Sequence, residues 1–315
     1  MALHRLTAEP THSVWDRSLP PRLHIASGDQ VEFVCADASG RQVFPGMTTE
    51  EYLEIDRTRI HALTGPIWVD GAELGDVLQI DVLSTTHHGW GWSSIVEGLG
   101  LLKDRFQVPC LFHWTLEEEC TRSLLPAVVP VRPFLGVMGV APAEAGSFRT
   151  RPPGTFGGNM DVRELSAGSR LYLPVFNDGA LFSCGDGHAA QGDGEVCING
   201  IECPLDVLLR FRLHKQTNLA SPVIEASDSA RKDALGDAWI VVETGSDLLQ
   251  TARAATSRMI DLLTSRWGFS EVHAYILCSV AMRLRISQLV NEPIHTVTAA
   301  LAKHILPARE LFPVR

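Results

Sequence analysis

Residues 173–202 read LPVFNDGALFSCGDGHAAQGDGEVCINGIE and hold the densest group of chemically active side chains in the chain. Within them, three acids and one histidine lie close together: Asp186, His188, Asp193 and Glu195. Glycines flank these four at positions 179, 185, 187, 192 and 194. Because glycine tolerates positive φ and lets polar groups approach one another closely, the stretch predicts a functional site presented by turns.

The spacing of these four residues predicts how their side chains are presented. Asp186 and His188 are two residues apart, as are Asp193 and Glu195, so each pair would project to one face of an extended chain. A turn between the pairs would let them converge. Carboxylate oxygen and imidazole nitrogen both bind Zn²⁺, and such a mixed set suits a catalytic site with an open position. A glycine-rich hairpin loop with solvated charges explains the same pattern without a metal.

The segments around this stretch are typical of β-structure. Short runs rich in apolar and β-branched residues, several of them alternating with period two, predict strands. The expected strands lie at residues 23–25, 31–34, 65–69, 77–83, 131–140, 171–176, 180–183 and 206–213. We therefore expect residues 1–215 to form a β-rich domain, a sandwich or a barrel, that carries the site.

The pattern changes in the last third of the chain. The expected elements there are a strand at 239–242, helices at 246–265 and 270–283, and a strand at 296–301. Ser246 is the expected N-cap of the first helix, and Gly268 is expected to stop it. Apolar residues at three- and four-residue steps indicate the helices, and the second helix is expected to bury Tyr275, Ile276 and Val280. Residues 216–315 are thus predicted to form a smaller α+β domain with two helices, so the fold class is mainly β.

Composition narrows the range of partners. The 315 residues are 45% apolar and 20% charged, which is typical of a globular protein with a sizeable core. The formal net charge of −10 argues against nucleic acid or an anionic membrane as the main partner. The sequence shows neither a signal peptide nor a transmembrane segment, so a cytoplasmic location is expected. Seven cysteines without CxxC spacing indicate neither a disulfide framework nor a thiolate zinc site.

Four motifs carry a resemblance to a known family. They are GPIWVDGAELGDVL at 65–78, FGGNMD at 156–161, LPVFNDGALFSCGDGHAAQGDGE at 173–195 and LRISQ at 284–288. With these motifs the chain resembles the acetamidase/formamidase family over most of its length. The resemblance implies a mainly β fold, a bound divalent metal (zinc, sometimes beside calcium) and hydrolysis of short aliphatic amides to ammonia and the carboxylate. It also implies a homo-oligomer, a dimer or larger.

The resemblance also suggests roles for individual residues. We expect Asp161, Asp186 and His188 to bind the metal, with Glu195 as a further ligand or as the general base. The expected catalytic residues are Glu195, Asp193 and His188, and the expected substrate-binding residues are Asn159 and Gln191. A zinc ion with three protein ligands lowers the pKa of a bound water to about 7. A nearby carboxylate can then pass the water proton to the departing amine.

Several alternatives stay open at this stage. Arg283 and Glu97 stand where the family usually carries an aspartate and a proline, so another C–N substrate, such as a larger amide or an N-formyl compound, fits the sequence as well. A β-sandwich that clamps calcium as a structural ion would need no turnover. A nucleophilic cysteine near His188 is a further alternative, since Cys184 and Cys197 flank this stretch. A serine amidase is disfavoured because the chain has no GxSxG elbow.

Overall fold

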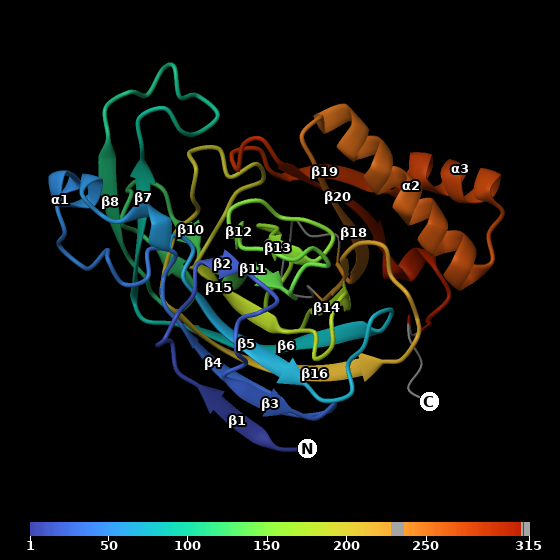
Figure 1. Cartoon of the computed structure of the whole chain (residues 1–315). Coiled ribbons are helices and arrows are strands. Elements are labelled where there is room, and N and C mark those ends of the chain that lie inside the picture. Colours follow the sequence, from blue (N-terminus) through green and yellow to red (C-terminus); the bar gives the residue numbers. More distant parts are fainter. Residues whose placement is uncertain (228–235, 310, 312–315) are drawn as a thin grey trace.

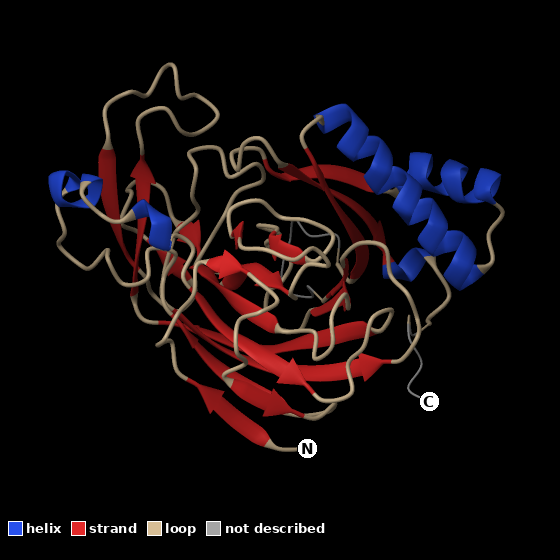
Figure 2. Cartoon of the chain, viewed as in Figure 1, coloured by secondary structure: helices blue, strands red, loops and turns tan. Residues whose placement is uncertain are grey.

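A computed structural model of the chain describes residues 1–227, 236–309 and 311, and strands dominate it (Figures 1 and 2). The larger of its two main sheets has nine strands. In spatial order these are β1 (Leu3–Leu6), β4 (Gln30–Cys35), β16 (Leu205–His214), β6 (Val77–His87), β14 (Arg170–Pro174), β17 (Val223–Ala226), β18 (Ala238–Gly245), β20 (His295–Ala302) and β19 (Arg283–Gln288). The prediction of a mainly β fold is confirmed.

The second main sheet has five strands and carries most of the site. Its strands, in spatial order, are β13 (Gly157–Asn159), β11 (Phe134–Gly139), β15 (Phe182–His188), β5 (Leu63–Val69) and β3 (Leu23–Ile25). The remaining strands form short pairs: β2 (Val14–Trp15) with β12 (Phe148–Arg149), β7 (Trp90–Ile95) with β8 (Cys110–Thr115), and β9 (Cys120–Thr121) with β10 (Val129–Pro130). Pairing is antiparallel except between β1 and β4 and between β3 and β5.

The two main sheets pack face to face through alternate residues of their strands. In β16, the side chains of Leu205, Val207, Leu209 and Phe211 are buried, and the residues between them are only partly buried. This is the period-two pattern that the sequence of the strand predicts. Long antiparallel pairing with β6 keeps the register, apart from one irregularity between residues 208 and 209.

Three phenyl rings join the two sheets at the centre of the core. Phe33 and Phe211 belong to the large sheet, and Phe182 comes from the small one. The Phe182 ring centroid lies 5.2 Å from that of Phe211 and 6.0 Å from that of Phe33, both edge-on. Aromatic pairs with this geometry contribute beyond the area that they bury. This cluster fixes β15, the strand that carries Asp186 and His188, against the large sheet.

Two long helices cover part of the large sheet, away from the β7–β8 hairpin and the short helix α1 (Thr49–Leu53) (Figure 1). Helix α2 (Leu248–Trp267) begins at Asp247, whose carboxylate accepts a hydrogen bond from Gln250 N at 2.7 Å, so Asp247 takes the capping role expected of Ser246. Gly268 ends the helix with φ +75°, as expected from the sequence. Short 3-10 helices lie at Arg57–Arg59 and Lys303–Ile305.

Helix α3 (Glu271–Ala281) corrects one prediction. Tyr275, Ile276 and Val280 were expected in the core, but all three are exposed. The buried residues are Ala274 and Cys278, which are four residues apart and pack into the core shared with α2. Small side chains at these positions let α3 lie close to α2, so the larger apolar side chains face outward.

The large sheet is continuous across the expected domain boundary. Residues 170–172 of β14 pair with residues 223–225 of β17, so strands from both sides of residue 215 share one ladder. The division into 1–215 and 216–315 stays a prediction. Among the described helices, none has the length and apolar character needed to cross a membrane.

The central phenyl cluster leads to a stability prediction. Because Phe211 is fully buried between the sheets, we expect Phe211→Ala to lower the free energy of unfolding by about 3–5 kcal/mol. Leu74→Ala, at a position that is 67% exposed, is the matched control and should change it by less than about 0.5 kcal/mol. Urea unfolding measures both. A loss below about 1 kcal/mol for Phe211→Ala would show that the cluster does not join the sheets as described.

Candidate active site

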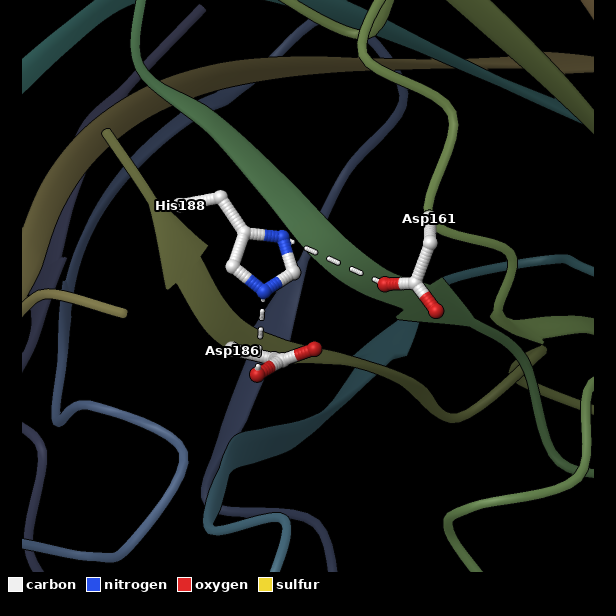
Figure 3. Close-up of side chains that lie close together, drawn as sticks. All are labelled: Asp161, Asp186 and His188. Carbon is white, nitrogen blue, oxygen red and sulfur yellow. Dashed lines mark ion pairs between the residues drawn. The ribbon is translucent and has the colours of Figure 1, made fainter. Parts of the chain in front are cut away.

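Five buried ionisable side chains converge in one pocket. They are Asp161, Asp186, His188, Glu195 and Glu202, and none is more than 5% exposed. Figure 3 shows the first three, with the imidazole lying between the two aspartates. His188 Nδ1 is 4.0 Å from Asp161 Oδ1, and His188 Nε2 is 3.8 Å from Asp186 Oδ1. Nε2 also lies 3.7 Å from Glu195 Oε1 and 2.8 Å from Glu202 Oε1.

Strand β15 and the loops near it bring these residues together. Asp186 and His188 lie on β15, Asp161 follows β13, and Glu195 and Glu202 come from the loop after β15. Asp161, Asp186 and Glu195 all have positive φ, at +51°, +59° and +49°. Residues other than glycine seldom adopt this conformation, and it costs on the order of 1–3 kcal/mol at each position. The surrounding fold therefore holds three of the four acids in strained backbone, as is common at functional sites.

A glycine on the neighbouring strand makes room for the convergence. A Cβ atom placed on Gly136 of β11 would lie 2.5 Å from Asp186 Oδ2 and 2.6 Å from Asp161 Oδ1. It would also lie 2.7 Å from His188 Cε1. Real Cβ contacts are essentially never this short, so any side chain at this position would displace the cluster.

Burial and mutual repulsion set the protonation of the cluster. Burial, with the charge of Asp186, raises the pKa of Asp161 to about 7. Burial also raises the pKa of Glu202 to about 8, although His188 opposes this, and raises that of Glu195 well above its usual range. For His188, burial disfavours the imidazolium, but Glu202 and Asp186 outweigh it and raise the pKa. The cluster thus favours added positive charge, either protons or a cation.

Two sets of side chains in the cluster could hold a metal ion. The first is Asp161, Asp186 and His188, and the second is His188, Glu195 and Glu202; within each set the ligand atoms lie within 4.8 Å of one another. In the first set, His188 Nδ1 and Asp161 Oδ1 are buried and have no hydrogen-bond partner among the described residues. Buried polar atoms are usually paired, so these two atoms point to a ligand between them.

Strand β19 and the residues that follow it make hydrogen bonds that hold the cluster in place. Asn291 Nδ2 donates to Asp161 Oδ2 at 2.9 Å, and Gln288 Oε1 accepts from the backbone N of Val290 and of Asn291. Gly194 N donates to Ser287 O at 3.0 Å, and Leu289 N donates to Gly194 O at 3.2 Å. The LRISQ motif therefore positions both Asp161 and the loop that carries Glu195.

The predicted substrate-binding and catalytic residues separate into two groups. Asn159 lines the pocket, and its Nδ2 donates to Arg151 O at 3.1 Å. Gln191 and Asp193 do not line the pocket. Gln191 Nε2 donates to Asp161 O at 2.9 Å and so holds backbone. Asp193 is half exposed and pairs with Arg285 and with Arg163.

The separation of Asp193 from Glu195 has a backbone cause. The expectation that both project to one face assumed extended chain. Gly194 has φ +90° and Glu195 has φ +49°, so the chain turns between the two side chains. Glu195 therefore points into the cluster, while Asp193 points outward to Arg285.

The sequence did not predict several of the residues that line the pocket. They are Glu202, His61, Asn291, Arg57 and Arg151. Glu202 lies within the quoted stretch, yet no spacing rule links it to His188, which it contacts through an isolated bridge between backbone segments. The remaining four come from distant segments that only the fold brings together.

Cys184 does not support thiol chemistry. It does not line the pocket, and its sulfur is buried 4.0 Å from that of Cys35. Burial raises the pKa of the Cys184 thiol, which disfavours the reactive thiolate. Cys197 also does not line the pocket, and burial raises the pKa of its thiol.

The pocket itself is small. Its cavity volume is about 50 Å³. Its walls also include the apolar side chains of Ile60, Trp92, Val96, Leu99 and Ile198. A small ligand can therefore contact apolar wall and ionisable cluster together, as is typical of sites for small molecules.

Known proteins share this sequence and this fold. A profile of the Acetamidase/Formamidase family matches residues 3–147 and 143–307. A formamidase of Methylophilus methylotrophus is 29% identical to this chain over 245 residues. The match covers 60% of this chain and only 60% of the length of that formamidase. A crystal structure titled as a predicted acetamidase/formamidase from Thermoanaerobacter tengcongensis superposes with a TM-score of 0.88 at 28% identity, covering 97% of each chain.

An acetamidase structure from Bacillus halodurans gives a TM-score of 0.87 at 31% identity, over 96% of this chain and 98% of that one. The sequence match extends across both halves of the chain. The motifs FGGNMD and DGHAAQGDGE supply residues that line the pocket, and LRISQ precedes Asn291, which also lines it. On this evidence, the chain belongs to the acetamidase/formamidase family.

Proposed function

We propose that the protein hydrolyses short linear amides, of the formamide and acetamide type, to the carboxylate and ammonia in the pocket around His188. The buried cluster of four carboxylates and one imidazole in a small cavity is the observation that carries this proposal. Family membership and relatives named formamidase and acetamidase support the reaction type. The limited volume of the cavity favours small amides.

We further propose that Asp161, Asp186 and His188 hold a divalent metal, expected to be zinc. The unpaired His188 Nδ1 and Asp161 Oδ1, and the space left by Gly136, fit such an ion. His188 Nε2 would then hydrogen-bond to Glu202, as in the carboxylate–histidine–metal arrangement common at zinc sites. A set that includes imidazole nitrogen suits zinc better than calcium, which prefers oxygen ligands. When bound, such an ion supplies a Lewis acid and an acidified water.

The side chains around this centre have separable roles in the proposed reaction. Glu195 lies beside His188 at the pocket wall, where its carboxylate can take a proton from the attacking water and return it to the departing nitrogen. Glu202 fixes the imidazole ring of His188. Asn291 holds Asp161 in place. The expected homo-oligomer and cytoplasmic location stay predictions.

Chelation is the first test of this proposal. We expect purified protein to release ammonia from formamide, acetamide or propionamide, to lose this activity with a chelator, and to regain it with Zn²⁺. Metal content is measured on the same samples. Metal without turnover of any of the three amides, even after zinc is restored, would exclude the short-amide assignment. Turnover that survives complete removal of metal would exclude the metal centre.

The role of Glu195 can be separated from metal binding. We expect Glu195→Gln to keep its zinc and to lose about 10²–10⁴-fold in kcat, since the amide cannot accept the water proton. Metal analysis and steady-state ammonia release are compared with those of wild type. Loss of zinc together with activity would make Glu195 a ligand instead of the base.

Gly136 tests the geometry of the centre. We expect Gly136→Ala to weaken zinc binding at least about tenfold and to reduce turnover with it, because the new methyl group would overlap the three converging side chains. Gly192→Ala is the matched control. No heavy atom lies within 4 Å of a Cβ at residue 192, so this variant should bind zinc as wild type does. Equal zinc affinity in both variants would place the metal elsewhere.

A further inference from the structure

Two arginines line the same pocket as the acid cluster. Arg57 is exposed and Arg151 is half-buried. Within the described part of the chain, neither forms an ion pair with a carboxylate. Other arginines of the structure do so: Arg163, Arg170, Arg210, Arg258 and Arg285. Two guanidinium groups without a carboxylate partner among the described residues therefore share this pocket with the acid cluster.

The local structure holds Arg57 in place. Its Nη1 donates to Tyr52 Oη at 3.1 Å, and its Nη2 donates to Tyr52 O at 3.3 Å. The guanidinium also lies over the Tyr52 ring, 4.5 Å from the centroid. Tyr52 is buried and its hydroxyl is 2.9 Å from Ser94 Oγ. A guanidinium has five N–H donors, so most of those on Arg57 remain available.

The backbone of Arg151 is equally constrained. Asn159 Nδ2 donates to its carbonyl, and Pro152 and Pro153 follow it, which fixes two successive φ angles. Its guanidinium makes no hydrogen bond with any described residue. Burial lowers the pKa of Arg151, and the charges of Arg149 and Arg57 lower it further. An anion near Arg57 and Arg151 would relieve both effects.

We propose that Arg57 and Arg151 form a subsite for a carboxylate, so that the substrates this pocket prefers are monoamides of small dicarboxylic acids. The inference rests on the amide hydrolysis proposed above and names the class of amide. Guanidinium groups bind carboxylates through paired, charge-assisted hydrogen bonds. Hydrolysis of such a substrate adds the water oxygen to the amide carbon and breaks the C–N bond. Both water protons go to the nitrogen, so a dicarboxylate and ammonium leave.

A different role for the two arginines must be distinguished. Their charges also act against the negative charge of the acid cluster, since Glu195 is among the groups that influence Arg151. An arginine that only balanced this charge would affect neutral and anionic amides alike. A carboxylate subsite would instead discriminate between two amides of the same shape and different charge.

Succinamate and succinamide make this comparison, because they differ only in a carboxylate against a neutral amide. We expect kcat/KM of wild type for succinamate to exceed that for succinamide about 10- to 100-fold, as a hydrogen bond to a charged group allows. Arg151→Gln and Arg57→Gln should each lower this ratio at least about tenfold, and Arg151→Lys should keep part of it. Arg253→Gln, an exposed arginine of α2 outside the pocket, is the matched control and should leave the ratio unchanged.

The outcomes separate the two proposals. If wild type hydrolyses acetamide but its kcat/KM values for succinamate and succinamide are nearly equal, the carboxylate subsite is overturned and amide hydrolysis stands. Equal loss on both substrates in Arg151→Gln would assign the arginine to charge balance and overturn the subsite. Absence of ammonia from acetamide, succinamide and succinamate would overturn both proposals. If Arg151→Gln does not fold, the wild-type ratio and Arg57→Gln decide the question.

Discussion

Burying four carboxylates beside one imidazole costs desolvation free energy, and the structure around the site must compensate for it. A buried carboxylate loses its hydration and is tolerated only with hydrogen bonds and positive charge around it. Here Asn291 donates to Asp161, and His188 pairs with Glu202. The imidazole is the only basic side chain inside the cluster, and it cannot balance four acids. Raised pKa values of Asp161, Glu195 and Glu202 show that the cluster favours bound protons or a cation, and the divalent ion proposed above would supply such a charge.

The scaffold supplies the rigidity that holds such a cluster. The phenyl rings of Phe33, Phe182 and Phe211 lock β15 between the sheets, and Gly136 on β11 leaves space in front of it. Strained backbone at three of the acids persists only where surrounding packing over-determines it. Strand β19 completes the enclosure from the other end of the chain. Residues that are 130 positions apart, Asp161 and Asn291, thus meet in one hydrogen bond.

Much of the fold could be predicted from local patterns, and much of the site could not. The period-two pattern of β16 and the stop of α2 at Gly268 depend on neighbouring residues, and both agree with the structure. The prediction of which residues of α3 are buried was wrong, because burial depends on which face of this helix packs against α2. The sequence placed Asp186, His188 and Glu195 in one short segment. It could not place Asp193, because the turn at Gly194 depends on tertiary contacts with β19.

The pocket combines two opposite charge systems. The acid cluster is buried, whereas Arg57 is exposed and Arg151 is half-buried. In a low-dielectric cavity such an arrangement acts on the orientation of a bound molecule, because each end of the molecule meets a different field. An amide that carries a distal carboxylate would be aligned with its carbonyl toward His188 and its charge toward the guanidinium groups. A neutral amide of the same length would lack this alignment, so orientation, which contributes strongly to catalysis, would depend on the arginines.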